Sequence, residues 1–272
     1  MPTATRQLSH LADALVQVCL EIASDQTGID PAGFIVVALG KLGGNEVNYS
    51  SDIDLLFLTE SDASACHGLG QRLINNLSEV THDGFLYRVD MRLRPWGRVG
   101  ALVTSTGAYL TYLEKHAALW EKQALLKARI IAGDIDAGNA FFERLYPLIF
   151  ASIGDNVRSE VHAMKLMTEA YLIQKGRDWG EVKLGEGSIR DIEFVTQVLQ
   201  LRHKLRGGNT LDTLALLSSG ELFNSEDYRT LVDGYIFLRT IEHYLQMMHY
   251  QQTNRLPRET EALHYLARRL GF

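Results

Sequence analysis

The spacing of apolar residues predicts that the chain begins with a small α/β segment. Between residues 7 and 23, apolar side chains recur at intervals of three and four, which predicts an amphipathic helix. Short apolar runs bounded by glycine, polar residues or proline predict strands, and a helical pattern separates two of them. The predicted elements are strands over 34–40, 52–58 and 84–95, and a helix over 64–80.

After residue 105 the pattern becomes mostly helical. Residues 106–126 have a helical pattern, and the stretch LLKARIIAGD predicts a short strand and a turn. Further helices are predicted over 137–150, 157–174, 189–205, 210–218, 225–252 and 259–270. The fold class is therefore α+β, with a small mixed sheet in a first domain over 1–135 and an all-helical bundle over 136–272.

Composition narrows the class of protein. The chain has 272 residues, 46% of them hydrophobic and 22% charged, as in ordinary globular proteins. A net charge of −6 disfavours a nucleic-acid partner. Cys19 and Cys66 have no metal-ligand spacing, which favours free thiols in a reducing compartment. The apolar runs are far shorter than the roughly 20 residues of a membrane span, so we expect no membrane association and a cytoplasmic location.

Two aspartates on the second predicted strand form the first candidate site. Asp52 and Asp54 are two residues apart, so their carboxylates share one face of a strand. Their mutual repulsion would raise the pKa of one of them unless a cation lies between them. Oxygen ligands of this kind favour Mg²⁺, with Mn²⁺ as the second choice. The alternative is a pair of solvated carboxylates at a strand end.

A glycine-containing loop precedes the aspartates. Gly43 and Gly44 allow backbone N–H groups to approach a phosphate closely, and Ser51 adds a hydroxyl group beside the proposed metal ligands. The loop does not have the spacing of a P-loop. The alternative is a plain glycine turn.

The third predicted strand supplies another carboxylate. Every second position of this strand carries a charged residue: Arg88, Asp90, Arg92 and Arg94. This spacing predicts that all four side chains share one face. A structural ion-pair cluster would explain this arrangement. Three strand-borne carboxylates beside a phosphate-binding loop would instead form a two-metal site for phosphoryl or nucleotidyl transfer, with arginines holding phosphate oxygens.

These features together resemble the DNA-polymerase-β-like nucleotidyltransferase superfamily. Four longer stretches look like the glutamine synthetase adenylyltransferase/adenylyl-removing enzyme family: GKLGGNEVNYSSDIDLLF, YRVDMRLRPWGRVGALVTS, LWEKQALLKARIIAGD and VKLGEGSIRDIEFVTQVLQL. The resemblance extends from about residue 5 to the end. It implies an enzyme with two homologous halves, one attaching AMP to a tyrosine of glutamine synthetase and the other removing it by phosphorolysis to give ADP. This chain is similar to one of the two halves, and more to the N-terminal, adenylyl-removing half. The resemblance therefore implies that the chain is a fragment of the longer enzyme or a naturally split half.

The resemblance also implies roles for individual residues. It implies that the metal is bound by Asp52, Asp54 and Asp90. The candidates for nucleotide or phosphate contact are Gly43, Gly44, Ser51, Arg92, Arg94, Arg190 and Glu193. Arg190 and Glu193 belong to the helix predicted over 189–205, with Ser188 as its N-cap, and the alternative is that this helix start only packs on the catalytic domain. Lys41 is open to phosphate contact or to an ion pair within the fold.

The partners implied are glutamine synthetase as protein substrate, ATP or ADP, and phosphate. The PII signalling protein would act through the full-length enzyme. Two alternatives stay open: an adenylyl-attaching half that uses ATP, and a catalytically idle module that docks glutamine synthetase or PII. The presence of all three carboxylates argues against the idle module.

Overall fold

A computed structural model describes residues 2–151, 153–249 and 252–272. The first half contains α1 (Pro2–Thr27), β1 (Phe34–Leu39), α2 (Gly40–Gly43), β2 (Ile53–Thr59), α3 (His67–Ser78), β3 (Val89–Asp90), β4 (Val103–Ser105), α4 (Thr106–Lys115), α5 (Leu119–Leu125) and β5 (Arg129–Gly133). It is followed by α6 (Ile135–Phe150), α7 (Val157–Gln174), α8 (Ile189–His203), α9 (Thr210–Ser219), α10 (Ser225–His249) and α11 (Thr260–Arg269). This confirms the predicted α+β class.

The sheet is small and mixed, as predicted. Its strand order is β3–β2–β1–β5, and β4 also pairs with β2. β1 is antiparallel to both of its neighbours, whereas β3 and β4 run parallel to β2. β3 pairs with the beginning of β2 and β4 with its end. The two short strands therefore bring the chain back twice to β2.

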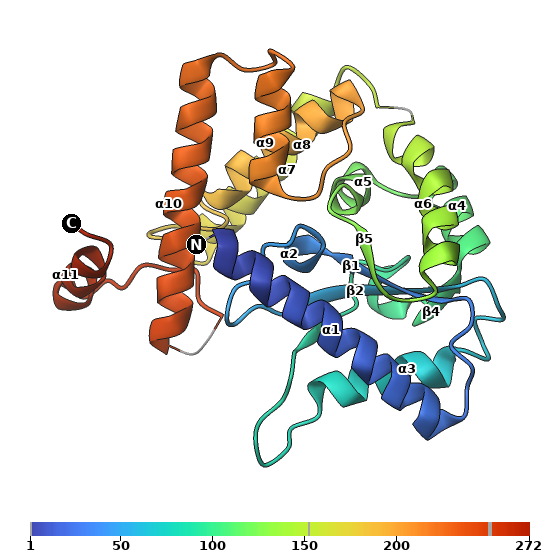
Figure 1. The fold of residues 1–272 in the computed structure, drawn as a ribbon. Helices are drawn as coiled ribbons and strands as arrows, with labels where there is room; N and C mark the ends of the chain where they lie inside the picture. The colour runs from blue at the N-terminus through green and yellow to red at the C-terminus, as the bar shows by residue number, and fades with distance from the viewer. Residues whose placement is uncertain (1, 152, 250–251) are drawn as a thin grey trace.

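Both faces of the sheet are covered, which explains why β1 and most of β2 read as continuous apolar runs. On one face, Val36 and Phe57 belong to a core shared with α1 and α3. On the other face, Val37 and Leu56 belong to a core shared with α4, α5 and α6. Figure 1 shows these two groups of helices on opposite sides of the strands.

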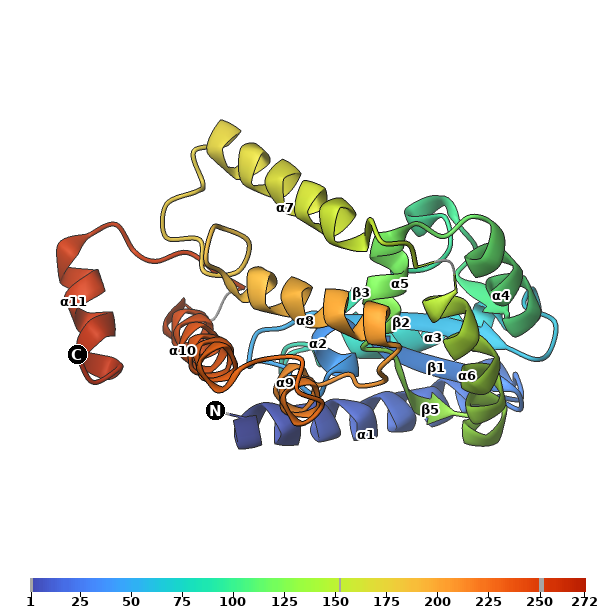
Figure 2. The ribbon, with the colours of Figure 1, turned by 90° about the horizontal axis from the view of Figure 1, so that it is seen from above.

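The later helices join the same body. Leu201 of α8 and Val161 of α7 are buried in the core that covers the second face of the sheet. α8, α9 and α10 pack on one another through Ile192, Leu214 and Tyr235. α11 lies on the outer side of α10, away from the sheet (Figure 2). The helical part thus contacts the sheet directly, and a domain boundary at residue 135 stays a prediction.

The predicted strand over 84–95 is wrong except at Val89 and Asp90. The guanidinium of Arg94 donates hydrogen bonds to the carbonyl oxygens of Met91, Arg98 and Gly100. These bonds fold the following residues into a closed loop, so the alternation expected of an extended strand stops after Asp90.

Other boundaries differ less. The helix predicted over 106–126 is divided into α4 and α5, because the carboxylate of Glu121 accepts the N–H of Ala118 and starts a new helix there. α1 is longer than predicted, and a short α2 begins the glycine loop. The helix predicted over 225–252 is described to His249, and residues 250 and 251 lie outside the described part. No helix in the described ranges is long and apolar enough to cross a membrane.

Candidate active site

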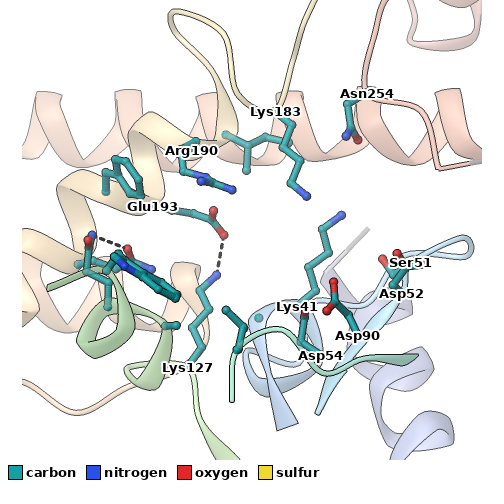
Figure 3. Close-up of a pocket in the computed structure, with 18 of the residues that line it drawn as sticks. Lys41, Ser51, Asp52, Asp54, Asp90, Lys127, Lys183, Arg190, Glu193 and Asn254 are labelled. Carbon is teal, nitrogen blue, oxygen red and sulfur yellow. Dashed lines mark hydrogen bonds and ion pairs between the residues drawn. The ribbon is translucent and has the colours of Figure 1, made fainter. Parts of the chain in front are cut away.

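A cleft of about 680 Å³ separates the edge of the sheet from the helices α5, α7 and α8. One wall carries acidic residues at the ends of β2 and β3. The other wall carries basic, amide and aromatic side chains from α5, from α8 and from the loop that precedes α8. Figure 3 shows side chains of both walls pointing toward one another.

The three predicted carboxylates all line this cleft. Asp54 and Asp90 are register partners on the parallel strands β2 and β3, and Asp52 directly precedes β2. Figure 3 shows the carboxylates of Asp54 and Asp90 close together. Burial and the charges of Asp90 and Asp52 raise the pKa of Asp54 to about 6, although Lys183 and Arg92 oppose this shift. The structure therefore concentrates negative charge where the sequence predicts a metal site.

The three neighbouring arginines have different roles and do not share one face. The Nε of Arg88 lies 2.5 Å from Oδ1 of Asp52. The Nε of Arg92 lies 2.7 Å from Oδ2 of Asp90. Burial raises the pKa of Asp90, but the hydrogen bonds and charge of Arg92 outweigh it and lower that pKa. Arg92 lines the cleft, whereas Arg94 holds the adjoining loop. The shared face predicted for these arginines is wrong because the strand ends at Asp90.

The donor set suits a hard divalent cation. In the described part of the chain, no three His, Cys, Asp or Glu side chains stand arranged to hold a metal ion. Two of the three carboxylates face arginines instead. The raised pKa of Asp54 nevertheless shows that its charge lacks sufficient compensation. A cation between Asp54 and Asp90, with Arg92 turned toward a phosphate, would supply that compensation.

The glycines before β2 divide into two groups. Gly40 lines the cleft at a φ of +53°, and a β-carbon there would lie 2.3 Å from Oδ2 of Asp54. A β-carbon on Gly43 would lie 2.0 Å from the carbonyl oxygen of Lys127, and one on Gly44 would lie 3.0 Å from that of Gly208. Gly43 and Gly44 thus allow close backbone packing, and their contact with phosphate stays a prediction. Ser51 lines the cleft as well.

Lys41, Arg190 and Lys183 are among the basic side chains that line the cleft. The Nζ of Lys41 lies 2.7 Å from Oε1 of Glu242, and burial lowers the pKa of Lys41 to about 8 against the effect of that carboxylate. The guanidinium of Arg190 lies 5.4 Å from the ring centroid of Phe194. Lys183 makes no side-chain hydrogen bond or ion pair to any residue that the structure describes. Figure 3 shows the amino groups of Lys183 and Lys41 entering from opposite walls.

Glu193 lines the cleft and is also part of a buried ion-pair network. The Nζ of Lys127 lies 2.6 Å from Glu193 and 2.8 Å from Glu46. Although burial opposes ionisation of Glu193, Lys127 and Arg190 lower its pKa to about 2. Arg239, whose side chain is 2% exposed, lies 2.9 Å from Glu242. These pairs connect α8 and α10 to the glycine loop and so fix the two walls of the cleft relative to each other.

Lys165 holds the loop that carries Lys183. Its Nζ lies 2.7 Å from Asp191 and donates to the carbonyl oxygens of Leu184, at 3.2 Å, and of Gly185. Asp191 in turn accepts the N–H of Ser188 at 2.9 Å, so Ser188 is the N-cap of α8, which begins at Ile189 as the sequence predicts. The same anchor therefore sets the position of Lys183 and the start of α8.

Sequence reasoning missed Lys183 and Gly40. Both lie in stretches that carry the family resemblance, VKLGEGSIRDIEF and GKLGG. A lysine followed closely by glycines was the available signal for Lys183. Nothing local marked Gly40, because its role depends on the approach of Asp54 from the neighbouring strand.

Comparison with known proteins identifies the family. Residues 2–144 match the family described as glutamate-ammonia ligase adenylyltransferase. The chain belongs to this family. Residues 162–272 match a second family, described as GlnD PII-uridylyltransferase. The family resemblance inferred from the sequence is thereby confirmed.

Curated relatives align with most of this chain. A bifunctional glutamine synthetase adenylyltransferase/adenylyl-removing enzyme of Hahella chejuensis is 39% identical over 98% of this chain and 31% of its own length. Proteins of the same name from Streptomyces avermitilis and Acinetobacter baylyi are 38% and 37% identical, over 97% and 94% of this chain. The chain spans about 30% of the length of these relatives.

Proposed function

We propose that this chain is a nucleotidyl-transfer unit that removes AMP from an adenylylated tyrosine of glutamine synthetase by phosphorolysis. The observation that carries the proposal is the placement, across one cleft, of three carboxylates opposite Arg190 and Lys183, which has no ion-pair partner among the described residues. Such an arrangement suits a phosphate group held between cations and an acidic metal site. The names of the curated relatives support the protein substrate.

The proposed step is a displacement at the phosphorus of AMP. An oxygen of inorganic phosphate attacks this phosphorus, the bond to the tyrosine oxygen breaks, and ADP and a tyrosine phenolate result. The phenolate then takes a proton from water. Lys183 and Arg190 neutralise the phosphate groups, and Arg92 can turn from Asp90 toward them. Ser51 hydrogen-bonds a phosphate oxygen beside Asp52.

Asp52, Asp54 and Asp90 would hold Mg²⁺, or Mn²⁺ in its place. When bound, the cation supplies neutralisation of the phosphoryl oxygens and orientation of the reacting groups. Asp54 would be the central ligand of this set, because it lies between Asp52 along the chain and Asp90 across the strand pair.

The wider partners follow from the family. The longer enzyme would respond to the PII signalling protein, and the match of residues 162–272 to a PII-uridylyltransferase family supports that expectation. The names of the relatives mention both the attachment and the removal of the adenylyl group. The attaching reaction, in which the tyrosine hydroxyl attacks the α-phosphate of ATP, is therefore the second candidate.

The test is to incubate the chain with adenylylated glutamine synthetase, Mg²⁺ and phosphate, and to measure ADP. We expect phosphate-dependent ADP formation that EDTA abolishes. A parallel incubation with unmodified glutamine synthetase and labelled ATP measures attachment. Label transfer without ADP formation would assign the chain to the attaching direction. Binding of glutamine synthetase with neither product would contradict catalysis and favour a docking module.

A further inference from the structure

Beyond the carboxylates, the cleft extends between α5 and α8. Two cross-links define its direction: Lys127 lies 2.6 Å from Glu193, and Gln123 lies 3.1 Å from Gln197. With increasing distance from the acidic wall, residue numbers therefore decrease from Lys127 to Gln123 and increase from Glu193 to Gln197. Trp120 lies one helical turn beyond Gln123, so it stands at the far end of the cleft.

The side chains change character along this path. On α8, Arg190, Glu193 and Gln197 line the cleft at intervals of three and four residues, as one face of a helix does. The charged residues stand near the carboxylates, and the amide stands farther away. At that end Trp120 is 46% exposed and lines the cleft together with Met164 of α7. An aromatic face accessible from a cleft is a surface on which a planar ring can stack.

The amide pair leaves two hydrogen-bonding groups available. The Nε2 of Gln123 donates to the Oε1 of Gln197. Neither Oε1 of Gln123 nor Nε2 of Gln197 bonds to another residue among those described. One acceptor and one donor, on two different side chains, are thus without a described partner, and Trp120 lines the same cleft. The edge of adenine presents an amino donor beside a ring-nitrogen acceptor, so it requires one acceptor and one donor from the protein.

The length of the cleft matches a nucleotide. Trp120 lies five residues before the end of α5 at Leu125, which is about 8 Å along the helix, and Lys127 follows two residues later. A ribose and a base fill such a distance when the phosphate lies between Asp54 and Lys183. We propose that Trp120, Gln123 and Gln197 form the nucleobase subsite, with the base stacked on the indole and its edge bonded to the amide pair. This inference rests on the proposed function and assigns the orientation of the nucleotide within the cleft.

The rival occupant is the tyrosine ring of the protein substrate. A phenol ring also stacks on tryptophan, but it carries one hydroxyl and cannot satisfy an adjacent donor and acceptor as a base edge does. Gln123 is only 3% exposed, and none of the described residues donates a hydrogen bond to its Oε1, so this oxygen can accept one from a ligand. These two observations favour the base.

The test measures binding of AMP and of ribose 5-phosphate, which lacks the base, to the chain by calorimetry. We expect Trp120→Leu to weaken AMP binding about tenfold and to leave ribose 5-phosphate binding unchanged. Trp120→Phe should retain most of the affinity. The matched control is Trp96→Leu: Trp96 is 59% exposed and packs on Tyr112 and His116, so its loss should change neither affinity.

Equal AMP affinity in the wild type and Trp120→Leu would overturn the subsite while leaving the proposed function intact. Loss of glutamine synthetase binding by Trp120→Leu with AMP binding unchanged would assign this end of the cleft to the protein substrate. If the wild type binds neither AMP nor ribose 5-phosphate, the proposed function fails along with the subsite. Unfolding temperatures of the variants confirm that each is folded.

Discussion

Asp54 and Asp90 are register partners on two neighbouring parallel strands, although 36 residues separate them in the chain. Parallel pairing places both carboxylates on the same face of the sheet edge, where the cleft opens. The consequence is a concentration of negative charge that raises the pKa of Asp54 to about 6 through burial and repulsion. The first prediction tests this relationship.

Asp54→Asn keeps the shape of the side chain and removes its charge. We expect AMP transfer to fall at least about 1,000-fold, because the cluster can no longer compensate a divalent cation. The fold should be retained. Asp83→Asn is the control, since the side chain of Asp83 is 96% exposed on a distant turn. Initial rates of ADP formation measure the effect, and near wild-type activity of Asp54→Asn would refute the assignment.

Gly40→Ala tests the close approach of backbone and carboxylate. The added β-carbon would lie 2.3 Å from Oδ2 of Asp54, so this carboxylate must move. Gly28→Ala is the matched control: Gly28 also has a positive φ, of +68°, but a β-carbon added there would have no described atom within 4 Å. Both variants should lose about 1 kcal/mol of stability through backbone strain. Only Gly40→Ala should also reduce transfer activity, and similar activities in the two variants would contradict the prediction.

Lys183→Ala should weaken the use of phosphate. Its amino group has no ion-pair partner among the described residues, so its removal leaves no carboxylate there unpaired and should not change stability. We expect a loss of about 100-fold in kcat/KM for phosphate. Lys175→Ala is the control, because Lys175 is exposed at the end of α7 and contacts Tyr171. Steady-state kinetics with phosphate as the varied substrate give the answer; equal kinetics in the two variants would exclude Lys183 from phosphate binding.

Glu193→Gln tests the stability role of the buried ion pair through its pH dependence. The pKa of Glu193 falls from 4.5 to about 2 on folding, because Lys127 and Arg190 outweigh the cost of burial. A lowered pKa adds stability above the unfolded value and loses it as the pH falls toward the folded value. We expect the variant to be less stable by about 2–3 kcal/mol at pH 7.

The difference between the wild type and Glu193→Gln should shrink between pH 4.5 and pH 2. Denaturant unfolding at several pH values measures it. Glu143→Gln serves as control, since the side chain of Glu143 is 73% exposed and its pair with Arg206 lies at the surface. A stability difference that does not depend on pH would show that the charge of Glu193 contributes nothing.

Local patterns in the sequence predict most of the elements. Helix α7 has the predicted bounds, and β1, β5, α6, α8 and α9 differ by a few residues at most. Periodicity succeeds here because each element buries one face or is wholly buried, and both conditions leave a mark in neighbouring residues. It fails over 84–95 except at Val89 and Asp90, and after Asp90 the bonds of Arg94 to nearby carbonyls fold the chain into a loop.

The candidate site was predictable where chemistry alone identifies it. Asp52, Asp54 and Asp90 stand out because carboxylates interrupt apolar runs, and all three line the cleft. The roles of the arginines were not predictable, since their partners depend on where the strand ends. Lys183 was missed for a related reason: the absence of an ion-pair partner for it within the described ranges is a property of the surrounding packing.

The sequence by itself determined the order of helices and strands, the apolar faces and the acidic residues, because each of these depends on residues close together in the chain. Only the tertiary structure decided which distant groups meet. Lys41 and Glu242 are 201 residues apart, and Lys127 and Glu193 are 66 apart. Such pairs form because the packing of α8 and α10 against the sheet leaves buried charges that require partners, and no local pattern specifies which partner arrives.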